Sequence, residues 1–320
     1  MRGAIFIGVL LAAASFSASP QTYPAKPVRI IVPSAPGGGY DFIGRLAAER
    51  FSQEFGQGFV VENRVGAGTL VGTQAAAAAL PDGYTLLVGG LANMAFNPGL
   101  HKDLRYDPVA DFTPIAMVGA FTYALVGRKH LAPSTLRELI DLARANPGGL
   151  TIATSGIGTG QHVSAVLLKR LANIDLLQIA YKGAQPAYVD LLGGRVDLFF
   201  DNTTTARPFI ADGRVKPFVT SGSVRDALLP NVPTGREAGL EDLVLDSWLG
   251  LFAPARTPKP IVELLRNSTI KFLQGSETRK RLEANGWRIM SMSSAETEAF
   301  VKSEAEKWPR LLQQAGIKAE

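Results

Sequence analysis

The chain has 320 residues, of which 46% are apolar and 19% charged. That length and balance fit about two globular domains. The formal net charge is only +5, and no basic stripe is interleaved with aromatic residues, which argues against nucleic-acid binding. Cysteine is absent and none of the three histidines has zinc-binding spacing, so the sequence predicts no disulfide, no metal site and no cofactor.

The first 20 residues have the pattern of a signal peptide. Arg2 gives a positive start, residues 4–14 form an apolar run, and residues 15–19 are mostly small. The run is too short to span a bilayer, and a buried N-terminal strand or helix is the alternative interpretation. We expect cleavage near Ser19 to Gln21. No later segment is long and apolar enough for a membrane span, so the mature protein is predicted to be soluble.

Short apolar runs then alternate with amphipathic segments. The expected elements of this part are strands at 28–32, 59–62 and 84–88, and helices at 42–55 and 70–80. The order strand, helix, strand, helix, strand predicts a parallel sheet with helices on both faces.

A second α/β pattern follows. Its expected strands are 115–118, 123–126, 151–154, 177–180, 196–200 and 215–220, and its expected helices are 136–145, 162–171 and 186–192. The last part has one expected strand, 249–253, and two helices, 260–274 and 294–314, which is too little strand for a third domain. We therefore expect it to return to the first lobe, so that residues 22–121 plus 246–320 form lobe 1 and residues 122–245 form lobe 2.

Two glycine-rich turns occupy equivalent places, each between a strand and a helix. The first is Ser34-Ala35-Pro36-Gly37-Gly38-Gly39-Tyr40-Asp41, and the second is Thr154-Ser155-Gly156-Ile157-Gly158-Thr159-Gly160-Gln161-His162. Glycines leave backbone amides uncovered, and amides at a helix N-terminus lack internal partners and carry partial positive charge. The pair of turns therefore predicts an anion site, to which the Ser155 and Thr159 hydroxyls add donors.

Several residues of these turns allow two interpretations. Asp41 is either an N-cap or a side chain that orders the turn or a bound water. Tyr40 is either a wall of a ligand pocket or a side chain packed on the lobe surface. Asn93 follows a predicted strand and is placed to face the same cleft.

Catalytic and nucleotide-binding patterns match poorly. Gly156-Ile157-Gly158-Thr159-Gly160 has its third glycine one place too early for a dinucleotide fingerprint, although Asp175 lies near the spacing of a ribose-binding acid. There is no P-loop and no GxSxG elbow. His162 is either a first-turn helix residue bonded to the backbone or a general base, for which Asp201-Asn202 would have to supply an acid.

Many short motifs, in order from about Tyr23 to the C-terminus, make the chain resemble the tripartite tricarboxylate transporter receptors, also called Bug receptors. The motifs are Tyr23-Pro24-Ala25-Lys26-Pro27-Val28-Arg29, Pro36-Gly37-Gly38-Gly39-Tyr40-Asp41, Asn63-Arg64-Val65-Gly66-Ala67-Gly68, Pro81-Asp82-Gly83-Tyr84, Asp111-Phe112-Thr113-Pro114-Ile115, Tyr181-Lys182-Gly183-Ala184, Asp190-Leu191-Leu192-Gly193-Gly194, Leu229-Pro230-Asn231-Val232-Pro233-Thr234, Ser247-Trp248-Leu249-Gly250-Leu251-Phe252-Ala253-Pro254 and Thr257-Pro258-Lys259-Pro260.

The resemblance implies an α/β, bilobal type II periplasmic-binding-protein fold, with two lobes joined by a hinge. It also implies a monomeric periplasmic receptor, without enzymatic activity, that closes on a small organic acid and delivers it to membrane transporter subunits. The family's two carboxylate-binding turns and its acidic position in the second lobe match residues of this chain. With Asn93 added, the candidate ligand-binding residues are Ser34, Gly37, Gly38, Gly39, Tyr40, Asp41, Asn93, Ser155, Gly156, Gly158, Thr159, Gly160, Gln161, His162 and Asp201.

Two positions depart from the family pattern. Ala180 stands where proline is usual, and Tyr40 stands where threonine or serine is common. Tyr40 would stack on an aromatic acid, such as a benzene carboxylate or nicotinate, or it would shorten the pocket for a small acid. A dicarboxylate is also a candidate for the ligand. The alternatives to transport are a sensor that presents the acid to a membrane signalling protein, and a secreted hydrolase or dehydrogenase that uses the same cleft.

Overall fold

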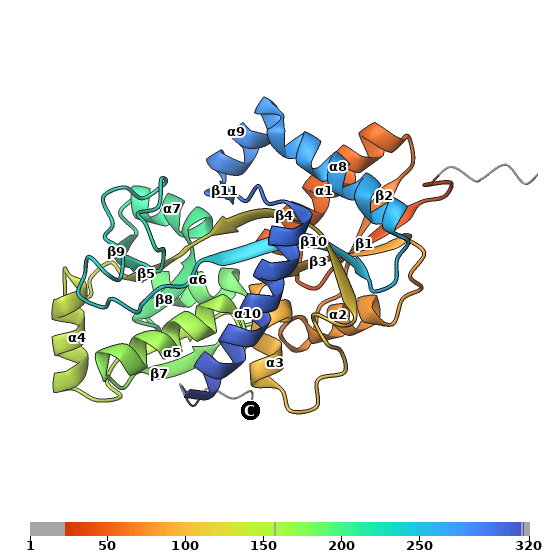
Figure 1. Ribbon diagram of the computed structural model, residues 1–320. Helices are drawn as coiled ribbons and strands as arrows, with labels where there is room; N and C mark the ends of the chain where they lie inside the picture. The colour runs from red at the N-terminus through yellow and green to blue at the C-terminus, as the bar shows by residue number, and fades with distance from the viewer. Residues whose placement is uncertain (1–22, 157, 315, 317–320) are drawn as a thin grey trace, which may run out of the picture.

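The computed structural model of the protein describes residues 23–156, 158–314 and 316. The predicted signal peptide lies outside these residues. Two mixed sheets, each covered by helices, lie beside one another, with the six-stranded sheet on the right of Figure 1 and the five-stranded sheet on the left. None of the helices in the described part of the chain is long and apolar enough to cross a membrane.

The six-stranded sheet has the strand order β11-β4-β10-β3-β1-β2. β1 pairs in parallel with β2 and β3, whereas β10 is antiparallel to β3 and β4. The predicted β-α-β-α-β unit is therefore confirmed, and the C-terminal part returns to this sheet through β10. The bounds are β1 Val28–Val32, α1 Gly39–Phe55, β2 Phe59–Asn63, α2 Leu70–Ala77, β3 Thr85–Gly90, β4 Phe112–Phe121, β10 Ser247–Pro254 and β11 Arg288–Ile289.

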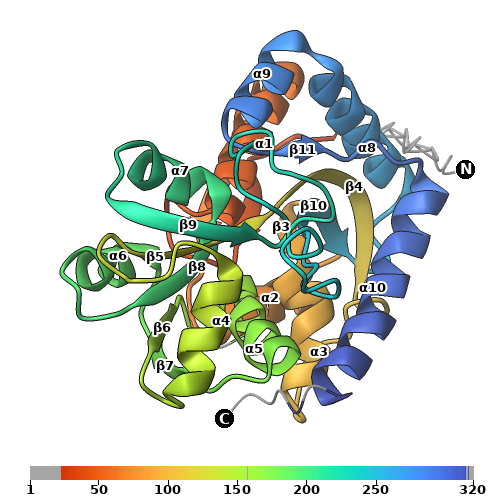
Figure 2. The ribbon, with the colours of Figure 1, turned by 90° about the vertical axis from the view of Figure 1, so that its left-hand side faces the viewer.

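The five-stranded sheet has the order β7-β6-β8-β5-β9. β6 is parallel to β7 and β8, and β5 is antiparallel to β8 and β9. Helices α6 and α7 pack on one face and α4 and α5 on the other (Figure 2). The bounds are β5 Tyr123–Arg128, α4 Leu136–Ala145, β6 Thr151–Thr154, α5 Gly160–Ala172, β7 Leu177–Ala180, α6 Ala184–Leu192, β8 Leu198–Asn202, α7 Thr203–Ala211 and β9 Val215–Thr220.

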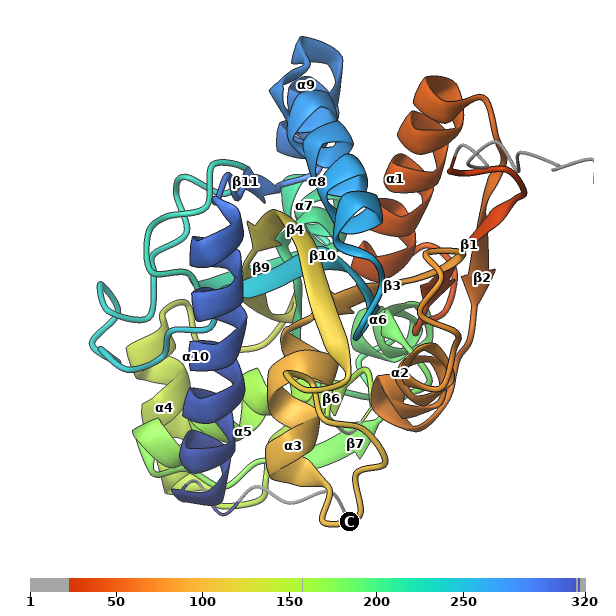
Figure 3. The ribbon, with the colours of Figure 1, turned by 45° about the vertical axis from the view of Figure 1, so that its right-hand side comes forward.

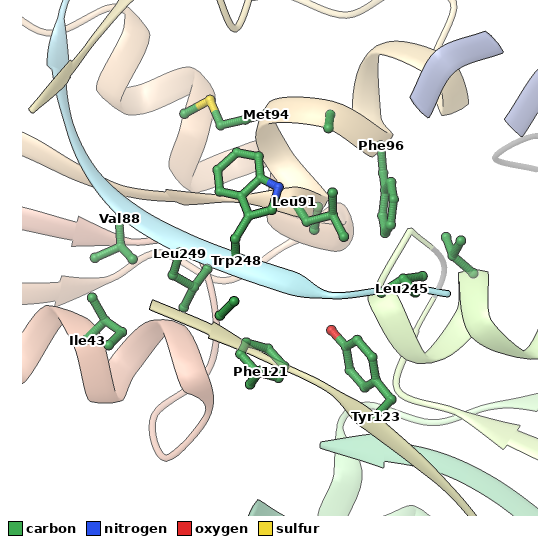
Figure 4. Packing of buried hydrophobic residues seen from close by; sticks show 14 of the residues in the cluster. Ile43, Val88, Leu91, Met94, Phe96, Phe121, Tyr123, Leu245, Trp248 and Leu249 are labelled. Atoms are coloured by element: carbon green, nitrogen blue, oxygen red, sulfur yellow. The ribbon is translucent and has the colours of Figure 1, made fainter. Parts of the chain in front are cut away.

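The chain passes between the two sheets twice, from β4 to β5 and from β9 to β10. Hydrogen bonds join the two crossings: Ser221 N–H donates to Tyr123 O (2.8 Å), and Leu245 N–H donates to Ser221 O (2.7 Å). Tyr123 and Leu245 lie close to the buried side chains of the first sheet in Figure 4. The crossings are where a hinge would lie, and the residue limits of the two lobes stay a prediction.

Several elements were not predicted. They are the 3-10 turn η1 Ala67–Thr69, the π-helix η2 Ala92–Phe96 and its continuation α3 Asn97–Leu100, α7 and β11. The bounds of α9 Ser276–Ala284 were not predicted either, although the basic run 279–281 was expected on an exposed helix face. β8 was predicted two residues early, because the polar residues Asp201 and Asn202 are in fact part of the strand, paired with Ala124 and Tyr123 of β5.

The C-terminal helix α10 (Ser294–Gln314) packs across η2, α3 and β4, whereas α8 (Lys259–Gln274) packs on β4 (Figure 3). In α10, one oxygen of the buried Glu304 carboxylate accepts hydrogen bonds from two indole N–H groups, that of Trp248 (3.0 Å) and that of Trp308 (2.8 Å). Trp308 in turn packs edge-on against Phe96 of η2. Glu304 therefore ties α10 to β10 and helps to hold η2 in place.

We predict that Glu304→Ala lowers the free energy of unfolding by about 3 kcal/mol, because it leaves two buried indole N–H groups unpaired. Urea unfolding followed by far-UV circular dichroism measures the change. Glu306→Ala, at an exposed position of the same helix, is the matched control and should change the stability by about 0.5 kcal/mol or less. Equal losses in the two variants would contradict the role of the indole bonds.

Candidate ligand-binding site

The first glycine turn leads directly into α1. The helix begins at Gly39 with Gly38 as its N-cap, and Gly37 has a φ of 85°, which favours glycine. No protein group among the described residues accepts a hydrogen bond from the amides of Gly38, Gly39 or Tyr40. The predicted helix N-terminus with uncovered amides is therefore present at this turn.

Asp41 does not act as the N-cap; the structure favours its second interpretation. It lies inside the first turn of α1, and its carboxylate accepts from Gly37 N–H (2.9 Å), Arg45 Nε (2.8 Å) and Asn63 Nδ2 (2.9 Å). Burial of the carboxyl opposes ionisation, but these hydrogen bonds outweigh it and lower the pKa of Asp41. Asp41 thus orders the turn as an anion, and it forms an ion pair with the nearby cation Arg45.

Tyr40 points into the first lobe and meets Asn93. Its hydroxyl donates to Asn93 Oδ1 (3.2 Å), which also accepts from Gly90 N–H (2.8 Å), while Asn93 Nδ2 donates to Thr73 Oγ1 (3.0 Å). Asn93 is completely buried, and burial raises the pKa of Tyr40 well above its ordinary value. The structure thus brings Tyr40 and Asn93 together, with the Tyr40 ring only partly covered.

Ser34 has a weaker link to the site. Its hydroxyl donates to the neighbouring carbonyl of Ala35 (3.4 Å), and its own carbonyl accepts from Asn63 Nδ2 (3.1 Å). These contacts brace the turn, and a ligand-binding role for Ser34 stays a prediction.

The second glycine turn leads into α5. Thr159 is the N-cap: its Oγ1 accepts from His162 N–H (3.3 Å) and donates to Gly156 O (2.7 Å). At Gly160, an added Cβ would lie 2.1 Å from the hydroxyl of Tyr123, so only glycine allows this close approach. The turn is thereby fixed against the start of β5, where the chain crosses between the sheets.

Polar groups of β8 and of the start of α5 lie close to this turn. Gln161 Nε2 donates to Asp201 Oδ1 (3.2 Å), and Gly158 N–H donates to His162 Nδ1 (3.4 Å), as the first interpretation of His162 predicts. In the described part of the chain, the buried Ser155 Oγ has no hydrogen-bond partner, whereas the Asp201 carboxyl interacts with the buried hydroxyl of Tyr188. Burial raises the pKa of Asp201 to about 7, despite the opposing hydrogen bond from Gln161.

The segment η2–α3 lies between the two turns. Asn93 contacts Tyr40 of the first turn, whereas Asn97, four residues later, lies close to Gly158 of the second. The two turns therefore approach one polar segment from opposite lobes. Asn97, Tyr106 and Tyr123 were not predicted as site residues, because isolated asparagine and tyrosine residues far from a glycine turn give no distinctive signal.

The alternative sites have less support. Asp175 precedes β7, and its carboxylate lies near Gly148 before β6, whereas the Gly156 to Gly160 turn follows β6 at the other end of the sheet. Asp175 therefore cannot serve as the ribose-binding acid of that turn. An open depression of about 520 Å³ is lined by residues between Pro98 and Asp111, none of which belongs to either turn. Within the described ranges, no group of His, Cys, Asp and Glu side chains could hold a metal ion.

Comparisons with known proteins identify the family and the fold. A family model described as the tripartite tricarboxylate transporter family receptor matches residues 43–317. The structure of periplasmic binding protein BugD is 33% identical, with a TM-score of 0.84 over 93% of this chain and 100% of that one. The predicted bilobal α/β periplasmic-binding-protein fold is confirmed.

Two further solved structures are described with bound acids. MatC from Rhodopseudomonas palustris, with bound malate, is 34% identical with a TM-score of 0.84, over 91% of this chain and 100% of that one. An R. palustris protein with adipate is 30% identical with a TM-score of 0.87, over 93% of this chain and 100% of that one. BugD is described as a periplasmic binding protein, and the matching family model describes a receptor.

Asp201 predicts a specific pH dependence of stability. Its folded-state pKa is about 7 against an ordinary 3.8, so between these values the unfolded chain loses a proton that the folded protein keeps. Stability should therefore fall as pH rises through this window, by up to about 4 kcal/mol, and the contribution should be constant above it. Asp201→Asn should remove this slope.

Urea unfolding at several pH values measures the effect. Asp212→Asn, at an exposed helix end, is the control and should keep the slope of the native protein. The difference in the free energy of unfolding between the native protein and Asp201→Asn should vary with pH. If this difference stays constant from about pH 4 to pH 7, Asp201 is not held in its neutral form.

Proposed function

The protein belongs to the tripartite tricarboxylate transporter family of receptors, and from this premise we propose its specific role. It binds a small organic carboxylate between its two lobes in the periplasm and delivers it, as a monomer, to the membrane subunits of a tripartite transporter. Carboxylate ligands in MatC and in the adipate-bound relative support the ligand class. The family and the periplasmic relative BugD support the location.

The observation that carries this proposal is the N-terminus of α1. The amides of Gly38, Gly39 and Tyr40 follow one another at the start of a 17-residue helix, and no described protein group accepts from them. Three such donors at the positive end of a helix dipole stabilise a carboxylate without a cationic side chain. The nearby cation, Arg45, is already paired with Asp41 at 2.8 Å.

The second turn supplies the opposite side of the proposed site. Its N-cap Thr159 orders the amides at the start of α5, and Ser155 Oγ is a buried hydroxyl without a hydrogen-bond partner among the described residues. Because the two turns belong to different sheets, a ligand held by both links the lobes. Bending at the two chain crossings would then open and close the site as a hinge.

Tyr40 limits the size of the proposed pocket. Its hydroxyl is fixed by Asn93, so the ring is held in one place rather than free to rotate away. We infer that the Tyr40 ring forms a wall of the site. An aromatic acid would stack on this ring, or the ring would shorten the pocket so that only a small acid fits. Tyr40→Ser should therefore change the preferred acid.

The test is thermal unfolding of the mature protein with aliphatic and aromatic mono-, di- and tricarboxylates, followed by calorimetry with the acids that bind. At about 1,000 times its dissociation constant, a ligand stabilises the folded protein by roughly 4 kcal/mol, a shift of many degrees. If no acid shifts the midpoint, the carboxylate class is wrong.

A matched pair of variants at Gly39 tests the amide site itself. Gly39 is the first residue of α1, where proline is tolerated, so Gly39→Pro removes the N–H while keeping the helix. Gly39→Ala keeps the N–H and adds the same Cβ, 3.2 Å from Trp287 Cζ2. Gly39→Pro should bind the acid at least about tenfold more weakly than Gly39→Ala, and equal affinities would contradict the proposed contact.

A further inference from the structure

The carboxamide of Asn97 carries a buried oxygen that receives no hydrogen bond from the described residues. Asn97 is completely buried, and its Nδ2 donates to Thr69 Oγ1 (3.1 Å) and to the Tyr106 hydroxyl (3.0 Å). No described protein group donates to Oδ1. Such an acceptor is unfavourable in a protein interior unless a ligand or a water completes it.

The orientation of this carboxamide is fixed by its neighbours. Tyr106 has a single hydroxyl proton, which it donates to Asn93 O (2.6 Å), so towards Asn97 it can only accept. The atom of Asn97 that faces Tyr106 must therefore be the nitrogen. Exchanging the nitrogen and oxygen positions would place two acceptors against each other, so the unpartnered atom is an acceptor, not a donor.

Asn97 Oδ1 faces the second glycine turn. A Cβ added at Gly158 would lie 3.6 Å from this oxygen and 3.3 Å from Leu100 Cδ1, so the turn covers Asn97 closely. The N–H of Gly158 is directed to His162 Nδ1 (3.4 Å) and does not serve Asn97. The described residues of the second lobe thus cover the oxygen without supplying a hydrogen-bond donor.

We propose that Asn97 Oδ1 accepts a hydrogen bond from the ligand, and that the receptor therefore selects carboxylic acids that also carry a hydroxyl or N–H donor. This inference rests on the proposed function: the glycine turns bind the carboxylate, and Asn97 Oδ1 accepts a hydrogen bond from a second group of the same molecule. An acid without a donor leaves the oxygen unpaired under the second lobe, and a donor on the ligand removes that penalty.

The test uses pairs of acids that differ by one hydroxyl: succinate and malate, butyrate and 3-hydroxybutyrate, and benzoate and its three hydroxy derivatives. Calorimetry gives both affinities of each pair for the native protein and for two variants. In at least one pair, the native protein should prefer the hydroxylated acid by about tenfold or more. Asn97→Leu should reduce that ratio to about twofold or less.

Asn97→Asp should keep most of the preference, because a protonated aspartic acid keeps the acceptor oxygen and one of the two donor hydrogens of the asparagine amide. Since each result is a ratio within one variant, a general loss of stability does not imitate it. If Asn97→Leu has no cooperative thermal transition, Asn97→Ala takes its place.

The outcomes separate this inference from the function on which it rests. If acids bind but no pair shows a preference in the native protein, or if Asn97→Leu keeps the native ratio, the role of Asn97 is wrong while the receptor function stands. If none of these acids and none of the wider carboxylate panel binds, the proposed function fails and the inference fails with it.

Discussion

The arrangement of the site depends on one completely buried amide, Asn93. It accepts from the end of β3 through Gly90 N–H, donates to α2 through Thr73, and accepts the hydroxyl of Tyr40 at the start of α1. Each of these bonds would be costly to lose in the interior, so three elements are held in one geometry. Because Asn93 and Asn97 belong to one continuous helical segment, fixing the first also fixes the second, which faces the other lobe.

The electrostatics of the site follow from this arrangement. Asp41 forms an ion pair with Arg45, and burial favours the neutral form of Asp201. The described side chains of the site therefore present hydroxyl and amide groups to a ligand rather than a full charge. The favourable field for an anion comes from the helix N-termini, which are positioned by backbone and do not vary with side-chain rotamer. Glu304 contributes at a distance, because it holds Trp308 against Phe96 in the same segment as Asn93 and Asn97.

The sequence predicted most of the regular elements and both glycine turns, because those depend on local patterns of apolar residues, glycine and proline. The role of Asp41 was left open, since its three donors come from Gly37, Arg45 and the distant Asn63. The strand β8 was misplaced because Asp201 and Asn202 look like a strand end, yet they pair with β5. The π-helix carries no local signal at all; its shape follows from packing under α10 and from the hydrogen bonds of Asn93.

The same polar atoms that define the site also relate ligand binding to the arrangement of the lobes. Asn97 Oδ1 comes from the first lobe and Ser155 Oγ from the second, and both are buried without hydrogen-bond partners among the described residues. Unpaired buried polar groups cost about 1–3 kcal/mol each. An arrangement that covers such atoms is therefore disfavoured unless a partner pairs with them, because water satisfies the same groups when they are exposed. A ligand that pairs with them lowers the free energy of the covered arrangement selectively, and only such a differential effect can shift a conformational equilibrium.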